Sequence, residues 1–258
     1  MSNATKGTIV TFINEKGGIG KTSCCFNIGW ELANQGYKIL MIDFDGQRAN
    51  LSFFCGVKKS ESMLTMYNIL QTGTDIREAI IGVKDNIDII PANVSVSDLS
   101  QGAKISRLKA SLREIKDEYD FVFVDVNPTP NWSHMLSLSV SDYVVIPMLP
   151  DIASLEANKG VIESITEVQE TMNPNLKVLG ILLNKYTNQT LLSREVLNTT
   201  EKMAASLGTV VFDGKIRQAV KMGECVMEHE GITDYDASAD VSKDIRLIAK
   251  EMLERIGE

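Results

Sequence analysis

The chain has few of the residues that mark disulfide-rich or metal-rich proteins. It holds two histidines, far apart, and no Cys-x-x-Cys pair, so no zinc-site spacing is present. Its four cysteines are too few and too scattered for a disulfide framework: Cys24, Cys25, Cys55 and Cys225. We expect the two adjacent cysteines to be small core residues.

Long apolar runs and an excess of basic residues are also missing. No run approaches the roughly 18 residues of a membrane span, and no signal peptide heads the chain, so we expect a cytoplasmic protein. Because the net charge is −8, any surface for non-specific DNA binding must be a local basic patch. With six prolines and no Ser/Gly-rich linker, we expect one domain over residues 1–258, with a flexible segment at 1–7.

Strand-like and helix-like patterns alternate along the chain. This alternation predicts an α/β fold, doubly wound, with a mostly parallel sheet and helices on both faces. We expect strands at residues 8–13, 37–42, 87–90, 121–124, 143–148 and 177–184, and a strand-like segment at 209–212. We expect helices at residues 22–34, 63–70, 104–118, 154–172, 191–207 and 240–256.

A glycine-rich loop follows the first predicted strand and precedes the first predicted helix. Strand, glycine turn, Lys-Thr and helix form the layout of a P-loop, whose backbone N–H groups close around phosphate oxygens. Lys21 would reach the β- and γ-phosphates, and the Thr22 hydroxyl would bind Mg²⁺. The predicted nucleotide-binding residues are Lys16, Gly17, Gly18, Ile19, Gly20, Lys21, Thr22 and Ser23.

One position of this loop departs from the common P-loop pattern. Glu15 stands where the first glycine is usual, and a second lysine, Lys16, stands five residues before Lys21. Since Lys21 already serves the phosphates of its own site, Lys16 could reach a second nucleotide across a dimer interface. The alternative is a solvated loop lysine.

Carboxylates end two of the predicted strands. Asp43 and Asp45 lie two residues apart, so in an extended chain both would face one Mg²⁺–phosphate centre. One would hold a Mg²⁺-bound water, and the other would position or deprotonate the attacking water. Asp125 follows four apolar residues in the Walker B layout and would anchor the Mg²⁺ shell. The alternatives are an Asp/Gly-rich turn and a buried strand that simply ends in Asp.

Two further features lie near the predicted site. The segment 127–130, Asn-Pro-Thr-Pro, is a stiff turn that we interpret as a switch near the γ-phosphate. Asn184 ends the strand at 177–184, and its amide could pair with the N6/N7 edge of adenine. The alternative for Asn184 is a strand-end turn.

With these motifs in place, the chain resembles the ParA/MinD family of deviant Walker ATPases, and within it most closely the ParA (Soj-like) partition branch. The resemblance runs from about residue 8 to about residue 255, and its most specific part is the Lys16 motif at 14–22. Further matching segments lie at 42–51, 120–128, 142–156 and 172–183.

The resemblance implies an ATPase that forms an ATP-sandwich homodimer, in which Lys16 crosses to the partner's nucleotide. It implies Lys16 and Asp45 as catalytic residues, the latter activating water, and Thr22, Asp43 and Asp125 as the Mg²⁺-shell positions. ParA-type relatives bind DNA non-specifically as ATP dimers, and a ParB-type adaptor stimulates their hydrolysis. The resemblance therefore implies a nucleoid-associated switch for plasmid or chromosome partition.

Two parts of the chain match this family loosely. Val-Asn-Pro-Thr at 126–129 stands where the family has a small residue and two prolines. DNA-contacting cations lie in the family's C-terminal half, where the candidates by rough position are Lys185, Arg194, Lys215, Arg217 and Lys221. For each of these, the alternative is a solvated surface of mixed charge.

Three other functions compete with partition. A MinD-like membrane ATPase would use the C-terminal tail, but its mixed charge predicts a packed helix and no membrane contact; its apolar side is Leu247, Ile248, Met252, Leu253 and Ile256. A P-loop biosynthetic ligase would need a pocket for a second, organic substrate, and no set of residues in the sequence indicates one. A nitrogenase-reductase-like protein would need cysteines in the middle of the chain, and none lies between Cys55 and Cys225.

Overall fold

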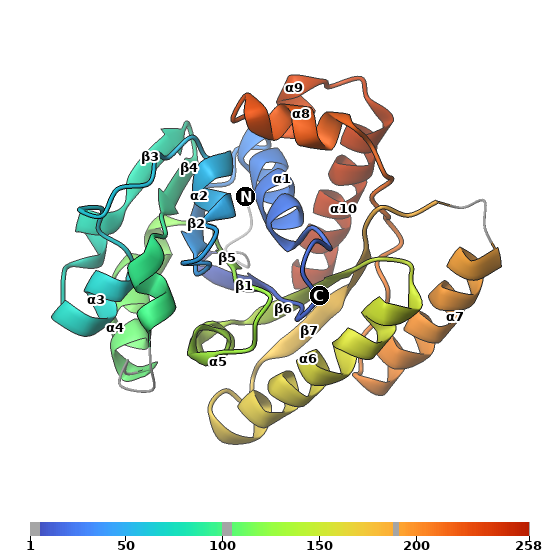
Figure 1. Ribbon diagram of the computed structural model, residues 1–258, viewed down its shortest axis with the longest axis horizontal. Helices are drawn as coiled ribbons and strands as arrows, with labels where there is room; N and C mark the ends of the chain where they lie inside the picture. Colours follow the sequence, from blue (N-terminus) through green and yellow to red (C-terminus); the bar gives the residue numbers. More distant parts are fainter. Residues whose placement is uncertain (1–5, 100–104, 188–190, 258) are drawn as a thin grey trace.

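A seven-stranded sheet forms the centre of the molecule (Figure 1). The structure is a computed structural model that describes residues 6–99, 105–187 and 191–257, with side chains described from residue 195 in the last range. The strand order is β3-β4-β2-β5-β1-β6-β7. The strands are β1 (Thr8–Phe12), β2 (Ile39–Asp43), β3 (Ile81–Lys84), β4 (Ile87–Ile90), β5 (Phe121–Asp125), β6 (Tyr143–Met148) and β7 (Lys177–Leu183).

All neighbouring strands run parallel except β3, which pairs antiparallel with β4 at one edge. The central strands β1, β2 and β5 are buried at every position, as expected of β-branched and aromatic runs covered on both faces. Their carboxyl ends lie side by side, with Asp43 opposite Asp125 in the β2–β5 register. The sheet therefore brings together the strand-end residues that the sequence singles out.

Helices cover both faces of the sheet, as Figure 1 shows, so the predicted fold class is confirmed. One face carries α1 (Lys21–Asn34), α2 (Asn50–Phe54), α8 (Lys221–Met227), α9 (Ile232–Tyr235) and α10 (Asp240–Gly257). The other carries α3 (Met66–Thr72), α4 (Ile105–Ile115), α5 (Trp132–Val140), α6 (Ile152–Thr171) and α7 (Leu191–Ser206). Short 3₁₀ turns lie at 76–79, 94–98 and 116–118.

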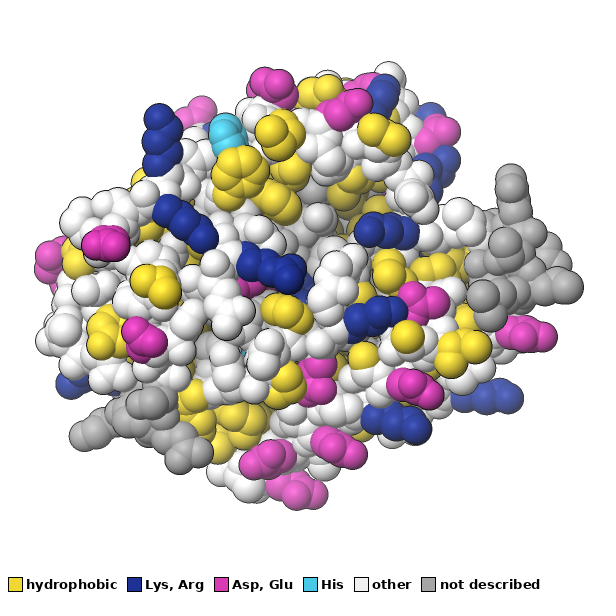
Figure 2. Space-filling view, in the orientation of Figure 1, with side chains coloured by type: hydrophobic (Ala, Val, Ile, Leu, Met, Phe, Trp, Pro, Cys, Tyr) yellow, Lys and Arg dark blue, Asp and Glu magenta, His cyan; other side chains and the backbone are white. Residues whose placement is uncertain are grey.

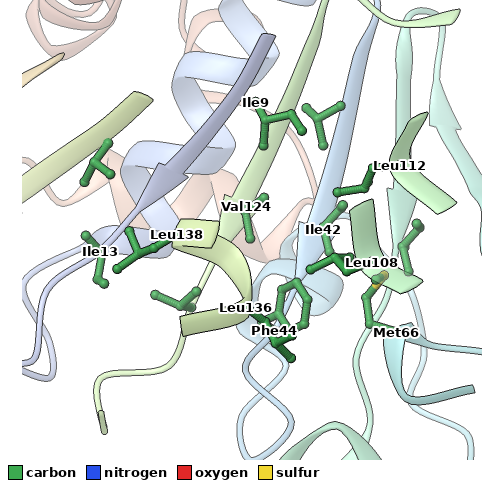
Figure 3. Packing of buried hydrophobic residues seen from close by; sticks show 14 of the residues in the cluster. Ile9, Ile13, Ile42, Phe44, Met66, Leu108, Leu112, Val124, Leu136 and Leu138 are labelled. Carbon is green, nitrogen blue, oxygen red and sulfur yellow. The ribbon is translucent and has the colours of Figure 1, made fainter. Parts of the chain in front are cut away.

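The core on the second face holds the strand ends in place. Ile42 and Val124 of the central strands are in one cluster with Leu108 of α4 and Leu136 of α5 (Figure 3). Each of these side chains is at most 1% exposed. Burial of one such aliphatic side chain contributes about 1.5–3 kcal/mol. This packing fixes the carboxyl ends of the central strands, where the candidate site lies.

Two helix starts lie close to the predicted ones, for identifiable reasons. Helix α6 begins at Ile152 because the Asp151 carboxylate accepts the Ser154 amide at 2.7 Å and caps it. Helix α3 begins at Met66, since Thr65 and Asn68 form a capping box.

The sequence prediction differs from the structure at one expected strand and at one missed helix, and it also misses the short elements β3, α2, α8 and α9. The segment 209–212 is not a strand: only the Ile181–Val211 bridge forms, because the Glu251 carboxylate accepts the next two amides, of Asp213 and Gly214. Helix α5 was not predicted, because its serines have low helix propensity. The proposed flexible segment 1–7 lies mostly outside the described residues, but Gly7 N donates to Tyr119 O at 2.9 Å and is buried.

The C-terminal helix α10 packs against α1, as expected of a packed terminal helix. Ile248, Met252 and Ile256 are buried there, whereas Leu247, assigned to the same apolar side, is 53% exposed. Within the described part of the chain, no helix is long and apolar enough to cross a membrane.

Candidate functional site

The glycine loop forms one wall of a cleft at the carboxyl ends of the strands. The cleft has a volume of about 510 Å³, and the hollow on the face shown in Figure 2 has Lys and Arg side chains around it. Gly18 and Gly20 have φ values of 77° and 92°, which favour glycine. A Cβ at Gly20 would lie 2.1 Å from Asn184 Nδ2, so glycine is required there. The loop lines the cleft with Gly17, Gly18, Gly20, Lys21, Thr22 and Ser23, but not with Ile19, which is fully buried.

Lys21 stands at the first position of α1, with its ammonium inside the cleft wall. The side chain is 6% exposed, and Nζ donates to Lys16 O at 3.3 Å. Burial lowers the pKa of Lys21, while the carboxylates of Asp125 and Asp45 act in the opposite direction. A partly desolvated cation beside a glycine-rich loop at a helix N-terminus is suited to an anionic ligand.

Thr22 and Asp125 meet at the base of the cleft. The Thr22 hydroxyl donates to Asp125 Oδ2 at 2.7 Å, and Asp125 Oδ1 is buried with no hydrogen-bond partner among the described residues. Burial, and next the charge of Asp43, raise the pKa of Asp125 well above its usual value. An unsatisfied carboxylate oxygen beside a hydroxyl fits a water-coordinated Mg²⁺, which is bound through few protein oxygens.

Asp43 lies behind this point and does not line the cleft. Its Oδ1 accepts the Asp45 amide at 2.9 Å, and its Oδ2 accepts the Ser52 amide and hydroxyl at 2.9 and 2.7 Å. Burial raises the pKa of Asp43 to about 6 against the effect of these bonds. The prediction that Asp43 and Asp45 face one centre is wrong in this structure, because β2 ends at Asp43 and the chain turns.

Asp45 lines the cleft and holds the turn that follows it. Its Oδ1 accepts the amides of Gln47 and Arg48 at 3.2 and 3.1 Å, and the side chain is 4% exposed. One carboxylate oxygen is thereby committed to the loop. Asp45 shares this cleft with Lys21 and Thr22, and its role in positioning water stays a prediction.

Lys16 lies outside the cleft. Its Nζ is 2.8 and 2.9 Å from the two carboxylate oxygens of Asp151 and 3.1 Å from Ser154 Oγ, at the N-terminus of α6. Burial alone would raise the pKa of Asp151, but the bonds from Lys16 and Ser154 lower it. In this single chain the lysine is therefore ion-paired and is neither a solvated loop residue nor a ligand of the cleft.

Asn184 lines the cleft, but both ends of its amide are engaged with backbone. Nδ2 donates to Ile19 O at 2.7 Å, and Oδ1 accepts the Lys185 amide at 2.9 Å. The amide thus fastens β7 to the P-loop, and the adenine contact would require these bonds to change.

The segment after Asp125 also reaches the cleft, through Val126 and Pro128. His134 Nε2 and Asn127 O are 2.7 Å apart, and burial lowers the pKa of His134. Asn127 Oδ1 is buried without a partner in the described part of the chain. The predicted turn therefore lies beside the P-loop, held by a residue of the unpredicted helix α5.

The predicted DNA-contacting cations do not form one open surface. Arg217 is paired with Asp240 and Asp244 at 3.2 and 2.7 Å, and Lys221 is paired with Asp236. Lys185 Nζ donates to Gly18 O at 3.4 Å. The ammonium of Lys215 lies 5.6 Å from the ring centroid of Tyr186. The side chain of Arg194 lies outside the described residues.

Sequence reasoning missed several residues of the cleft. Arg48, Asn50 and Phe54 line one side, and Gln218, Ala219, Val220, Met222 and Gly223 line another. Arg48 lies three residues after Asp45, within the segment 42–51 that matches the family. Its positive charge at that place could have indicated a residue that contacts the nucleotide. The segment 218–223 has no motif and reaches the cleft only through the fold.

Comparisons with known proteins place the chain in a family. Residues 7–178 match a family model described as an AAA domain. The chromosome-partitioning ATPase Soj of Treponema pallidum is 30% identical over 258 residues, covering 98% of this chain and 99% of Soj. The chromosome partitioning protein ParA of Caulobacter vibrioides is 28% identical over 255 residues, covering 96% and 94%.

Solved structures share the fold. Apo McdA from Cyanothece superposes with a TM-score of 0.85 at 19% identity, covering 95% of this chain and 99% of McdA. Cobyrinic acid a,c-diamide synthase from Mycobacterium smegmatis, with bound ADP and magnesium, has a TM-score of 0.81 at 22% identity, covering 96% and 94%. These structures show the fold; the matched AAA domain model and the near full-length match to Soj show that the chain belongs to the ParA/MinD family of P-loop ATPases, on its ParA (Soj-like) side.

Proposed function

We propose that this protein is a Mg²⁺-dependent ATPase switch that dimerises with ATP and drives the partition of plasmid or chromosomal DNA. The proposal rests on one observation: a single glycine-lined cleft has Lys21, Thr22 and Asp45 in its wall and Asp125 hydrogen-bonded to Thr22 at its base. A second lysine, Lys16, stands beside that cleft. The whole chain would serve as one P-loop domain.

The residues of the cleft have separate tasks in this proposal. The loop amides and Lys21 bind the phosphates, and Thr22 and Asp125 hold Mg²⁺, with Asp43 as a buried neighbour of the shell. Bound Mg²⁺ neutralises charge on the β- and γ-phosphate oxygens. Asp45 orients the attacking water through its second carboxylate oxygen and accepts a proton from it.

Dimerisation would use Lys16. In the single chain the Asp151 carboxylate and the Ser154 hydroxyl hold its ammonium. We propose that Lys16 leaves these partners when a second subunit brings an anionic nucleotide within reach. The switch then depends on a competition between one carboxylate and a triphosphate, which carries more negative charge.

DNA binding and a ParB-type adaptor complete the proposed cycle, with the protein on the nucleoid in the cytoplasm. The relatives named as chromosome-partitioning proteins support this role. We assign the DNA phosphates to Lys215 and to Lys185, which also lines the cleft, since carboxylates already neutralise Arg217 and Lys221. DNA contact at the latter two would require their ion pairs to open.

Two alternatives have less support. A MinD-like membrane contact would need a free C-terminal helix, whereas α10 buries Ile248, Met252 and Ile256 against the body of the protein. The fold alone does not separate a switch from a biosynthetic ligase, because cobyrinic acid a,c-diamide synthase shares it. The Lys16 motif favours the switch.

The test is release of phosphate from ATP by the purified protein, with and without Mg²⁺ and duplex DNA. We expect slow, Mg²⁺-dependent hydrolysis in the wild type and none in Lys21→Ala. DNA retention in an electrophoretic shift assay should require ATP and fall steeply with salt. Equal DNA binding by the nucleotide-free protein would refute the switch, and absence of any nucleotide binding would refute the ATPase.

A further inference from the structure

Arg48 is a cation of the cleft to which no motif assigns a role. It lies between β2 and α2, is exposed, and lines the cleft with Lys21, Thr22 and Asp45. Its guanidinium has no hydrogen bond or ion pair with any described residue. Arg217, on another wall of the same cleft, is paired with two carboxylates. Of these two arginines, only Arg48 is free to bind an anion in the cleft.

The backbone of Arg48 is held by the carboxylate that we propose to orient water. Asp45 Oδ1 accepts the Arg48 amide at 3.1 Å, and Asp45 O accepts the Ala49 amide at 2.7 Å. Ala49 is fully buried with φ 49°, a left-handed conformation that is unfavourable for alanine. A Cβ at Gly46 would lie 2.5 Å from Ser97 N, so the turn also packs tightly on its other side. Arg48 is therefore presented from a fixed turn.

The charges around Arg48 are arranged for an anion. Lys21 is the cation of the cleft that we assign to the phosphates, and its pKa is lowered first by burial and also by the positive charge of Arg48. Two like charges at one cleft disfavour each other, and a bound polyanion between them removes that cost. The Asp45 side of the cleft is where hydrolysis would occur, so the part of the nucleotide near Arg48 is its terminal phosphate.

We propose that Arg48 is a second phosphate-binding cation, which contacts the terminal phosphate of a bound nucleoside triphosphate and couples it to the Asp45 turn. This inference rests on the proposed ATPase function. A planar guanidinium matches two phosphate oxygens at once, and the contact is lost when the terminal phosphate leaves. Arg48 thereby gives the cleft a means to distinguish triphosphate from diphosphate.

The experiment compares Arg48→Ala with wild type in binding ADP and a non-hydrolysable ATP analogue with Mg²⁺, measured by calorimetry. We expect the dissociation constant of the analogue to rise roughly 10- to 100-fold, as for a lost charge-assisted contact, and that of ADP to change less than about 3-fold. Arg48→Lys should recover part of the loss, because it keeps the charge without the planar fork.

Lys58→Ala is the matched control. Lys58 is an exposed cation outside the cleft lining, so its removal changes the net charge equally. If Arg48→Ala weakened the binding of ADP and of the ATP analogue equally, or if Lys58→Ala lost as much analogue affinity, the inference would be overturned. Arg48 would then act only by long-range electrostatic attraction. An analogue affinity within about 2-fold of wild type in Arg48→Ala would overturn it as well. If the wild type bound no nucleotide, the proposed ATPase function would fail instead.

Discussion

Replacement of Asp151 by Asn should make ATP-dependent dimerisation easier. The side chains of Lys16 and Asp151 are 26% and 40% exposed, so solvent screens their ion pair. Partly exposed pairs of this kind contribute about 0.2–1 kcal/mol. Each dimer must break two such pairs if both lysines cross. The variant therefore removes a cost of about 0.4–2 kcal/mol, which corresponds to a dimer dissociation constant about 2- to 30-fold lower.

Asparagine is chosen because Asp151 also caps helix α6 through the Ser154 amide. Asn is as good an N-cap as Asp, whereas Asp151→Ala would also lose about 1 kcal/mol of stability. The assay is sedimentation equilibrium with Mg²⁺–ATP, in an Asp45→Ala background to suppress hydrolysis. A dimer dissociation constant that stays the same or rises would show that Lys16 does not have to leave Asp151, and the proposed competition would be wrong.

Four further predictions concern other residues of the site and the fold. Lys21→Ala would remove two charge-assisted phosphate contacts, so its ATP affinity should fall by about 3–6 kcal/mol, or roughly 150- to 20,000-fold, in calorimetry; micromolar binding would contradict the P-loop role. Asp45→Ala should still bind ATP, with some loss of affinity because the Gln47 and Arg48 amides lose their acceptor, but it should lower kcat by about 10²- to 10⁴-fold in phosphate release; unchanged turnover would reject Asp45 as the water-positioning group. Lys185→Ala should make the negative slope of log DNA affinity against log salt less steep by about 0.9. Arg217→Ala should change that slope little, because Arg217 is already paired with Asp244; the reverse result would assign the DNA contact to Arg217. Gly231→Ala would place a Cβ 2.2 Å from Trp30 Cγ, so it should cost about 1–3 kcal/mol, or roughly 2–12 °C in melting temperature, and an unchanged melting temperature would contradict this packing.

The sequence predicted the parts of the site that lie at the ends of strands. Lys21, Thr22, Asp45 and Asp125 follow regular apolar runs, and parallel strands bring such ends to one edge of a sheet. The doubly wound fold could be predicted for the same reason, since its strands and helices alternate in distinct hydrophobic patterns. The observed strand order places these residues at neighbouring positions.

Contacts between distant segments were outside the reach of local patterns. The Lys16–Asp151 pair joins residues 135 positions apart, and neither residue signals the other. The Asp43 carboxylate was assigned to the cleft by strand alternation, but the turn after β2 breaks that alternation and Ser52 takes its oxygens. The strand expected at 209–212 is likewise prevented by a tertiary contact, that of the Glu251 carboxylate with two amides.

The central claim is that one subunit's Lys16 completes the nucleotide site of a second subunit. Its most direct test is the molar mass of Asp45→Ala in solution, measured by light scattering with Mg²⁺–ATP and with Mg²⁺–ADP, beside the double variant Lys16→Gln, Asp45→Ala. We expect a dimer with ATP and a monomer with ADP for the single variant, and a monomer in both for the double variant, which should still bind ATP. A dimer that forms without Lys16, or a mass that does not respond to ATP, would contradict the claim.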